Sequence, residues 1–208
     1  MSDEKNAHFF ISKGISLYNL KKFNEAIECF DEAIKIDHLH YRAWSNKGVT
    51  LSKLRQYNEA VDCFNESLKI NPSNDMAWCN KGIALVELKK YNEAIDCFDQ
   101  TLRINPEYEK AWNYKGVAFD KLGKHNKAIK CFDKAIKINL EYVDTWCNKG
   151  IALDNLKKHD KAIKCFDKAI NLNPLYYRAW NYKGAALVEL GQLDEAIECY
   201  GKALKIKI

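Results

Sequence analysis

Apolar and small side chains recur along this chain at helical spacing, in pairs of short stretches separated by polar residues. Within residues 41–74, the first stretch holds Trp44, Gly48, Leu51 and Leu54, and the second holds Ala60, Val61, Phe64 and Leu68. Spacings of three and four residues bring side chains onto one face of an α-helix. Asn58 between the stretches is a typical N-cap, and Asn71-Pro72 ends the second stretch because proline cannot continue a helix. Residues 41–74 therefore predict a helical hairpin.

The hairpin pattern repeats with a period of 34 residues. All five Trp follow this period, at Trp44, Trp78, Trp112, Trp146 and Trp180, and six of the nine Gly do so at Gly14, Gly48, Gly82, Gly116, Gly150 and Gly184. The expected N-caps of the second helices are Asn24, Asn58, Asn92, Asn126, Asp160 and Asp194. A fixed period of this size indicates stacked supersecondary units rather than separate globular domains. We expect a polar N-terminal extension at residues 1–6 and six repeats at 7–40, 41–74, 75–108, 109–142, 143–176 and 177–208.

These columns resemble the tetratricopeptide repeat, a helix–turn–helix of about 34 residues. Besides the Trp and Gly series, the matching columns are Ala26, Ala60, Ala94, Ala128, Ala162 and Ala196, and Phe30, Phe64, Phe98, Phe132, Phe166 and Tyr200. The resemblance covers residues 7–208 without an insertion. It implies an all-α fold, a right-handed α-solenoid or superhelix, with the first helices of the repeats lining a concave groove.

One column departs from the family pattern, because it places lysine where the family usually has an apolar residue. Its members are Lys13, Lys47, Lys81, Lys115, Lys149 and Lys183. A buried ammonium without a partner is strongly unfavourable, so we expect each stem to lie along apolar surface while the head reaches a polar group. The candidate partners are carbonyls at helix C-termini, or the acidic column Asp31, Asp99, Asp133 and Asp167.

The resemblance places the other face of each first helix in the concave groove. The candidate partner-binding residues on this face are Arg42, Asn46, Asn80, Lys110, Asn113, Asn148, Arg178 and Asn181. The amides of Asn46, Asn80 and Asn148 can both donate to and accept from a peptide backbone, as in the asparagine ladder that some family members use. The alternative is that these amides are merely solvated. Arg42, Lys110 and Arg178 can pair with carboxylates, which favours an acidic segment as the partner.

The second helices change charge along the chain. Acidic residues dominate early, at Glu25, Glu28, Glu32, Glu59, Asp62 and Glu66, and lysines dominate later, at Lys127, Lys130, Lys134, Lys161, Lys164 and Lys168. A solvated surface, electrostatic self-association and an acidic partner on repeats four and five all fit this pattern. We do not expect nucleic acid as a partner, because the net charge of +5 is modest and few exposed aromatic residues accompany the lysines.

Composition and motifs exclude several classes of protein. With 47% hydrophobic and 29% charged residues, the chain is typical of a folded domain, and no apolar run approaches the ~18 residues of a spanning helix. The polar start lacks the apolar core of a signal peptide, so we expect a cytoplasmic protein without membrane contact. The eight Cys are expected to be reduced packing residues, because equivalent positions of stacked repeats lie too far apart for a disulfide. The absence of CxxC-type pairs argues against a zinc site. Without a phosphate-binding loop, dinucleotide fingerprint or nucleophile elbow, we expect no enzyme, catalytic residue, cofactor or metal.

These features predict a non-catalytic protein–protein interaction module, or scaffold, that binds a peptide or protein segment in its concave groove. The alternative is a self-assembling structural array whose copies stack end to end. This second hypothesis rests on the sixth repeat, which runs to Ile208 without a polar helix to cover its outward face.

Overall fold

The chain folds into consecutive α-helices, as the periodicity predicts. The computed structural model describes residues 2–207, and twelve helices and no strand occur among them. The helices are α1 (Ser2–Asn19), α2 (Phe23–Ile36), α3 (Tyr41–Lys53), α4 (Tyr57–Ile70), α5 (Asp75–Glu87), α6 (Tyr91–Ile104), α7 (Glu109–Lys121), α8 (His125–Ile138), α9 (Val143–Asn155), α10 (His159–Leu172), α11 (Tyr177–Glu189) and α12 (Leu193–Lys207). Helix α1 begins inside the six residues set apart as a polar extension. The all-α class and the tandem helix–turn–helix repeats are confirmed.

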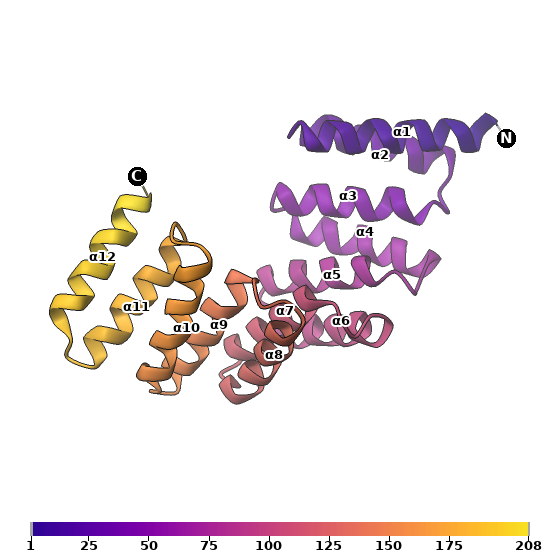
Figure 1. Ribbon diagram of the computed structural model, residues 1–208. Coiled ribbons are helices and arrows are strands. Elements are labelled where there is room, and N and C mark those ends of the chain that lie inside the picture. Colours follow the sequence, from indigo (N-terminus) through magenta and orange to yellow (C-terminus); the bar gives the residue numbers. More distant parts are fainter. Residues whose placement is uncertain (1, 208) are drawn as a thin grey trace. The chain divides into compact units, whose positions relative to one another are not determined.

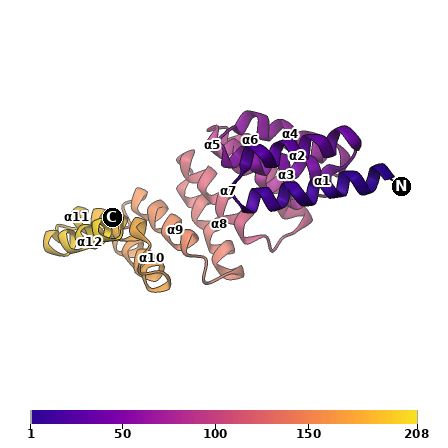
Figure 2. The ribbon, with the colours of Figure 1, turned by 90° about the horizontal axis from the view of Figure 1, so that it is seen from above.

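The repeats group into two compact bodies, an N-terminal half (Met1–Pro106, helices α1–α6) and a C-terminal half (Glu107–Ile208, helices α7–α12). In each half, three hairpins follow one another (Figure 1). The two helices of a hairpin lie side by side, as Figure 2 shows for α11 and α12. The second helix of one hairpin also contacts the first helix of the next, as α2 contacts α3 and α10 contacts α11. First helices of neighbouring hairpins touch as well, α1 with α3 and α9 with α11.

A phenylalanine against a glycine forms the centre of the hairpin core. Phe64 of α4 is fully buried, and its ring lies against Gly48 of α3. A Cβ atom on Gly48 would lie 2.8 Å from Cε1 of this ring, which is closer than side chains pack. The same pairing occurs in each repeat, with Phe30, Phe98, Phe132, Phe166 or Tyr200 against the corresponding glycine. Glycine therefore allows the two helices of each hairpin to approach.

Within each half, tryptophans bind the loop before their repeat, as Trp44, Trp78, Trp146 and Trp180 do. The indoles are only partly buried, and their Nε1 atoms donate to loop carbonyl oxygens. Trp78 donates to Pro72 at 2.9 Å, and Trp146 donates to Leu140 at 2.9 Å. Because these carbonyls lie just beyond the end of the preceding helix, each indole both packs between repeats and satisfies a loop carbonyl.

The predicted N-caps of the second helices are wrong. Helix α2 begins at Phe23 and α4 at Tyr57, so Asn24 and Asn58 lie inside the first turn and make no cap. The same shift applies to Asn92, Asn126 and Asp160 in α6, α8 and α10, and Asp194 lies inside α12. The cause is the tight turn before each second helix. In the first repeat Lys21 adopts a left-handed backbone with φ of 61°, and the N–H of Lys22 donates back to Leu17, so the next helix starts at once.

Candidate partner-binding surfaces

The lysine column behaves as predicted in three repeats. Lys47 reaches Asp31, Lys149 reaches Asp133 and Lys183 reaches Asp167, each with Nζ 2.6 Å from a carboxylate oxygen. The Lys47 side chain keeps only 21% of its surface exposed, and its Nζ lies 6.0 Å from the centroid of the Trp44 ring. Each pair joins the second helix of one repeat to the first helix of the next. These lysines therefore tie repeats together, and a ligand is not needed to explain them.

In the N-terminal half, the predicted groove residues keep their polar groups available. Asn46 on α3 and Asn80 on α5 occupy equivalent positions on two helices that contact each other, and both are partly exposed. Neither side-chain amide has a hydrogen-bond partner within the described part of the chain. Arg42 is exposed, and its Nε donates to the Tyr41 hydroxyl at 3.1 Å. This face thus offers two unengaged amides and a guanidinium.

In the C-terminal half, Asn148, the equivalent of Asn46, is bound to an asparagine of the neighbouring column, whereas Asn80 corresponds to Tyr182. Nδ2 of Asn148 on α9 donates to Oδ1 of Asn113 on α7 at 3.1 Å. Asn113 is only 2% exposed, and it shares its column with the fully buried Cys79 and Cys147. The column that contains Asn113 therefore packs between first helices, and Asn113 holds the Asn148 amide instead of meeting solvent.

Arg178 also has partners in its own chain. Its Nη1 donates to the Tyr176 hydroxyl at 3.1 Å and lies 3.8 Å from Oδ1 of Asp144. The Tyr176 hydroxyl donates to the same carboxylate. Burial, together with this hydrogen bond, raises the pKa of Tyr176, so the phenol remains a donor to Asp144. Tyr176 follows the 34-residue period together with Tyr108 and Tyr142, a signal that could have indicated it, although the residue lies in the loop before α11.

The remaining predicted residues lie apart. Lys110 on α7 is partly buried, whereas Asn181 on α11 is exposed. Asn181 lines a small cavity of about 340 Å³ with Tyr177, Tyr200, Ala203 and Leu204 of the last hairpin. Within each half, the predicted residues therefore lie in different local environments.

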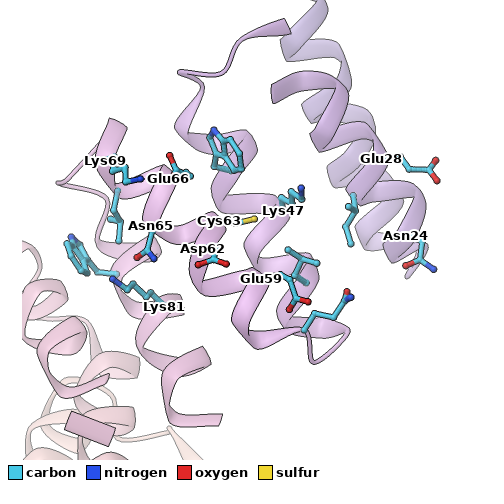
Figure 3. Close-up of a pocket in the computed structure, with 16 residues that line it drawn as sticks. Asn24, Glu28, Lys47, Glu59, Asp62, Cys63, Asn65, Glu66, Lys69 and Lys81 are labelled. Carbon is cyan, nitrogen blue, oxygen red and sulfur yellow. Dashed lines mark hydrogen bonds and ion pairs between the residues drawn. The ribbon is translucent and has the colours of Figure 1, made fainter. Parts of the chain in front are cut away.

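A larger cleft lies on the side of the second helices in the N-terminal half. It has a volume of about 1230 Å³ and is lined by α2, α3, α4 and α5. Apolar side chains, including Trp44, Leu51 and Trp78, contribute to its lining. Figure 3 shows Asn24 and Glu28 on one side, from α2, and Glu59 and Asp62 on the other, from α4. The sequence shows the acidic charge of this region but does not indicate a binding site there.

The cleft offers no reactive group. Burial raises the pKa of the Cys63 thiol to about 11, so the thiol stays protonated at neutral pH. Lys47 in the same cleft is already paired with Asp31. Lys81 lies with its Nζ 5.1 Å from the centroid of the Trp78 ring. The cleft combines aromatic surface with four carboxylates and the ammonium groups of Lys47, Lys69 and Lys81.

Elsewhere, titratable side chains pair in ways that stabilise the hairpins. Nδ1 of His125 lies 2.7 Å from Asp120, and Nδ1 of His159 lies 2.6 Å from Asp154, each joining the start of a second helix to the end of the first. The described residues contain no group of three or more His, Cys, Asp or Glu side chains that could hold a metal ion. Within residues 2–207, none of the helices combines the length and apolarity needed to cross a bilayer.

The repeated hairpins match known proteins in both sequence and structure. The sequence model described as tetratricopeptide repeat matches residues 9–38, 41–74, 76–108, 109–142, 143–176 and 177–207. Among the curated proteins, none matches the chain.

Solved structures with a similar fold include three named proteins. MamA has 26% identity, with 77% of this chain and 94% of that chain covered and a TM-score of 0.68. The pilF protein of Pseudomonas aeruginosa has 16% identity, coverage of 96% and 90%, and a TM-score of 0.82. YrrB, described as a TPR protein with an unusual peptide-binding site, has 23% identity, coverage of 86% and 93%, and a TM-score of 0.66.

Proposed function

The chain belongs to the tetratricopeptide repeat family, and on that premise we propose that it is a non-catalytic module that binds an extended protein segment along its first helices. Proteins of this family generally mediate protein–protein interactions. The observation that carries the proposal is the pair of unengaged amides, Asn46 and Asn80, at equivalent positions on the contacting helices α3 and α5. YrrB, which has a similar fold, is described as having a peptide-binding site.

The spacing of the two amides suits an extended backbone. Packed helices lie about 8–10 Å apart, whereas an extended chain advances about 3.3 Å per residue. Asn46 and Asn80 therefore meet backbone groups roughly three residues apart in the bound segment. Each amide donates one hydrogen bond and accepts another, so recognition depends on the backbone and tolerates different side chains.

Charge at the groove adds a preference for an acidic segment. Arg42 is exposed beside the two amides in the N-terminal half, so it can pair with a carboxylate of the ligand. Lys110 adds a second cation in the C-terminal half. Arg178 contributes less, because Asp144 already partly neutralises it. In the C-terminal half, the Asn148 amide contacts the ligand, and Asn113 fixes the orientation of that amide. Asn181 extends the surface onto α11.

The test uses peptides selected from a random display library against the wild-type protein. We expect Asn46→Ala/Asn80→Ala to weaken their binding at least about tenfold, since each lost hydrogen bond contributes about 1 kcal/mol. The matched control is Asn58→Ala/Asn92→Ala, which removes two exposed amides from the second helices of the same repeats. Equal affinities of the two variants would refute the asparagine contacts.

A second function, end-to-end self-assembly, is favoured by the outward face of α12. Ile197 is 68% exposed and Leu204 is 64% exposed. The equivalent residues of the preceding repeat are Ile163, which packs against the core, and Ile170, which is 8% exposed. We propose that a second copy covers this apolar face. Ile197→Asp/Leu204→Asp should then lower the mass seen in sedimentation, and an unchanged mass would remove this candidate.

A further inference from the structure

The cleft between α2 and α4 has an equivalent surface in the C-terminal half. Three periods of 34 residues, or 102 positions, separate the corresponding residues. Half of the lining is the same in both places, including its floor: Trp44 corresponds to Trp146, Lys47 to Lys149, Leu51 to Leu153, Cys63 to Cys165, Trp78 to Trp180 and Lys81 to Lys183. Both surfaces therefore share an aromatic floor.

The borders of the two surfaces carry opposite charge. Four acidic residues that line the N-terminal cleft are replaced by lysines: Glu28 by Lys130, Glu59 by Lys161, Asp62 by Lys164 and Glu66 by Lys168. The packed floor is retained while every acidic border position changes sign. Packing within the hairpin does not require this reversal, because the four lysines are all exposed.

The charges that face outward are not neutralised within the chain. Among residues 2–207, Glu59 and Asp62 have no ion-pair partner, and neither do Lys161 and Lys164. By contrast, Glu66 pairs with Lys69 on its own helix at 2.5 Å. Two acidic groups and two lysines are thus left available for an external partner.

The two helices carry their charges at matching intervals. On α4 the acidic residues occupy positions 59, 62 and 66, and on α10 the lysines occupy positions 161, 164 and 168. Steps of three and four residues keep each set on one helix face, over about 10 Å of helix. A ridge of lysines therefore has the length and spacing of the acidic border.

The floor of the cleft suits lysine side chains as well. Nζ of Lys202 lies 4.5 Å from the centroid of the Trp180 ring, which occupies the position of Trp78 in the C-terminal half. An ammonium over an indole face gains a favourable electrostatic contact, and the lysine stem covers apolar surface. In the cleft itself, Lys47 and Lys81 already lie 6.0 and 5.1 Å from the ring centroids of Trp44 and Trp78, so lysines of a partner pair with the carboxylates of the border.

We propose that the cleft between α2 and α4 binds the lysine-bearing face of α10 in a second copy of this chain. The two surfaces that meet are different, so the contact is heterologous, and a pair of copies still has one free cleft and one free lysine-bearing face. Such contacts produce rings or open chains of copies rather than a two-fold dimer. The contact uses the second helices, whereas the proposed peptide site uses the first helices.

The test is a charge exchange followed by sedimentation velocity. One variant is Glu59→Lys/Asp62→Lys, and the other is Lys161→Glu/Lys164→Glu; all four positions are exposed, so the fold should be retained. At about 0.05 M salt the wild type should associate as its concentration rises, and at about 0.5 M salt it should return to single chains. Each variant alone should remain a single chain at low salt. An equimolar mixture should associate again, because acidic and basic surfaces then lie on different molecules.

The matched control is Glu25→Lys/Glu32→Lys, which changes the net charge equally on α2 but lies outside the lining of the cleft. It should associate like the wild type. A wild type that stays a single chain at low salt up to about 100 μM, far above typical dissociation constants for specific contacts, overturns the proposal. So does a mixture of the two variants that fails to associate. Association that is as strong at about 0.5 M salt as at about 0.05 M salt also overturns it and points to the apolar face of α12.

Discussion

In both halves a buried phenylalanine packs against a glycine, Phe64 against Gly48 and Phe166 against Gly150. The exposed residues of the second helix are acidic in the first case and lysines in the other. The glycine–phenylalanine contact is the same in both halves, because the close approach of paired helices leaves little choice of side chain there. Other buried positions differ, since Thr50 and Ser67 are replaced by Ala152 and Ala169. The border is free of that constraint, so its charge can differ between repeats without altering the hairpin. The comparison indicates that the columns specify the fold while the residues between them specify partners.

The first helices differ between the halves in a second way. Asn46 and Asn80 keep their amides unengaged, whereas Asn148 is bound to Asn113. An amide that already has a partner must exchange that hydrogen bond to bind a ligand, which reduces the net gain. We therefore expect the N-terminal half to contribute more to peptide affinity than the C-terminal half.

The largest expected effect tests whether the cores are equivalent. Phe64→Ala and Phe166→Ala should each lower the free energy of unfolding by about 3–5 kcal/mol, because both rings are fully buried. Urea denaturation followed by circular dichroism measures the loss. Phe9→Ala is the control, since Phe9 is exposed on α1 and should change stability little. A large difference between the two losses in free energy of unfolding would show that the two sites are not equivalent.

A smaller effect tests the close approach of the helices. Gly48→Ala should lower the free energy of unfolding by about 1–3 kcal/mol, because the new Cβ atom meets the Phe64 ring. Gly201→Ala on α12 is the matched control, since nothing lies within 4 Å of a Cβ atom there. The control should be neutral or more stable, as alanine favours helix. Equal losses in the two variants would show that helix approach is not the cause.

The lysine column permits a sharper comparison between repeats. Asn65 occupies the position that holds Asp31 in the first repeat, so Lys81 lacks the carboxylate that Lys47 has. Asn65→Asp should supply it and raise the free energy of unfolding by up to about 1 kcal/mol, the range for partly exposed ion pairs. In a chain that also carries Lys81→Met, Asn65→Asp should no longer raise the free energy of unfolding. A gain that survives the loss of the ammonium would contradict an ion pair.

The smallest effect concerns pH at the junction of the first two repeats. Burial, with His8 nearby, lowers the pKa of His40 below the usual 6.5, and Asp37 and Arg42 act in opposite directions. Because the unfolded chain then binds the proton more readily, stability should fall as the pH drops through about 6.5 and below. Comparing the pH dependence of unfolding for wild type and His40→Gln measures this. Identical slopes in the two proteins would contradict the assignment to His40.

Much of the fold could be predicted from sequence because the columns act locally. Periodicity identified the hairpins, and the cost of an unpaired ammonium predicted a polar partner for Lys47, with Asp31 among the candidates. The N-caps were missed because the turn before each second helix depends on a left-handed residue, and Lys21 or Arg55 gives no sign of that conformation. Gly123 and Gly191 occupy this position in the fourth and sixth repeats, and they were the local clues.

The candidate sites could be predicted less well, because they depend on contacts between repeats. The burial of Asn113 follows from the packing of neighbouring first helices, which a single repeat does not reveal. Similarly, Tyr176 reaches Asp144 across one repeat interval. The acidic cleft was visible in sequence only as a charge pattern, since its aromatic floor comes from two successive first helices.

The most direct test follows the asparagine side chains by NMR while a library-selected peptide is titrated into the protein. The account predicts that the side-chain amide signals of Asn46 and Asn80 shift on binding while those of Asn58 and Asn92 stay in place. Binding that moves only Asn58 and Asn92, on the second helices, would contradict it.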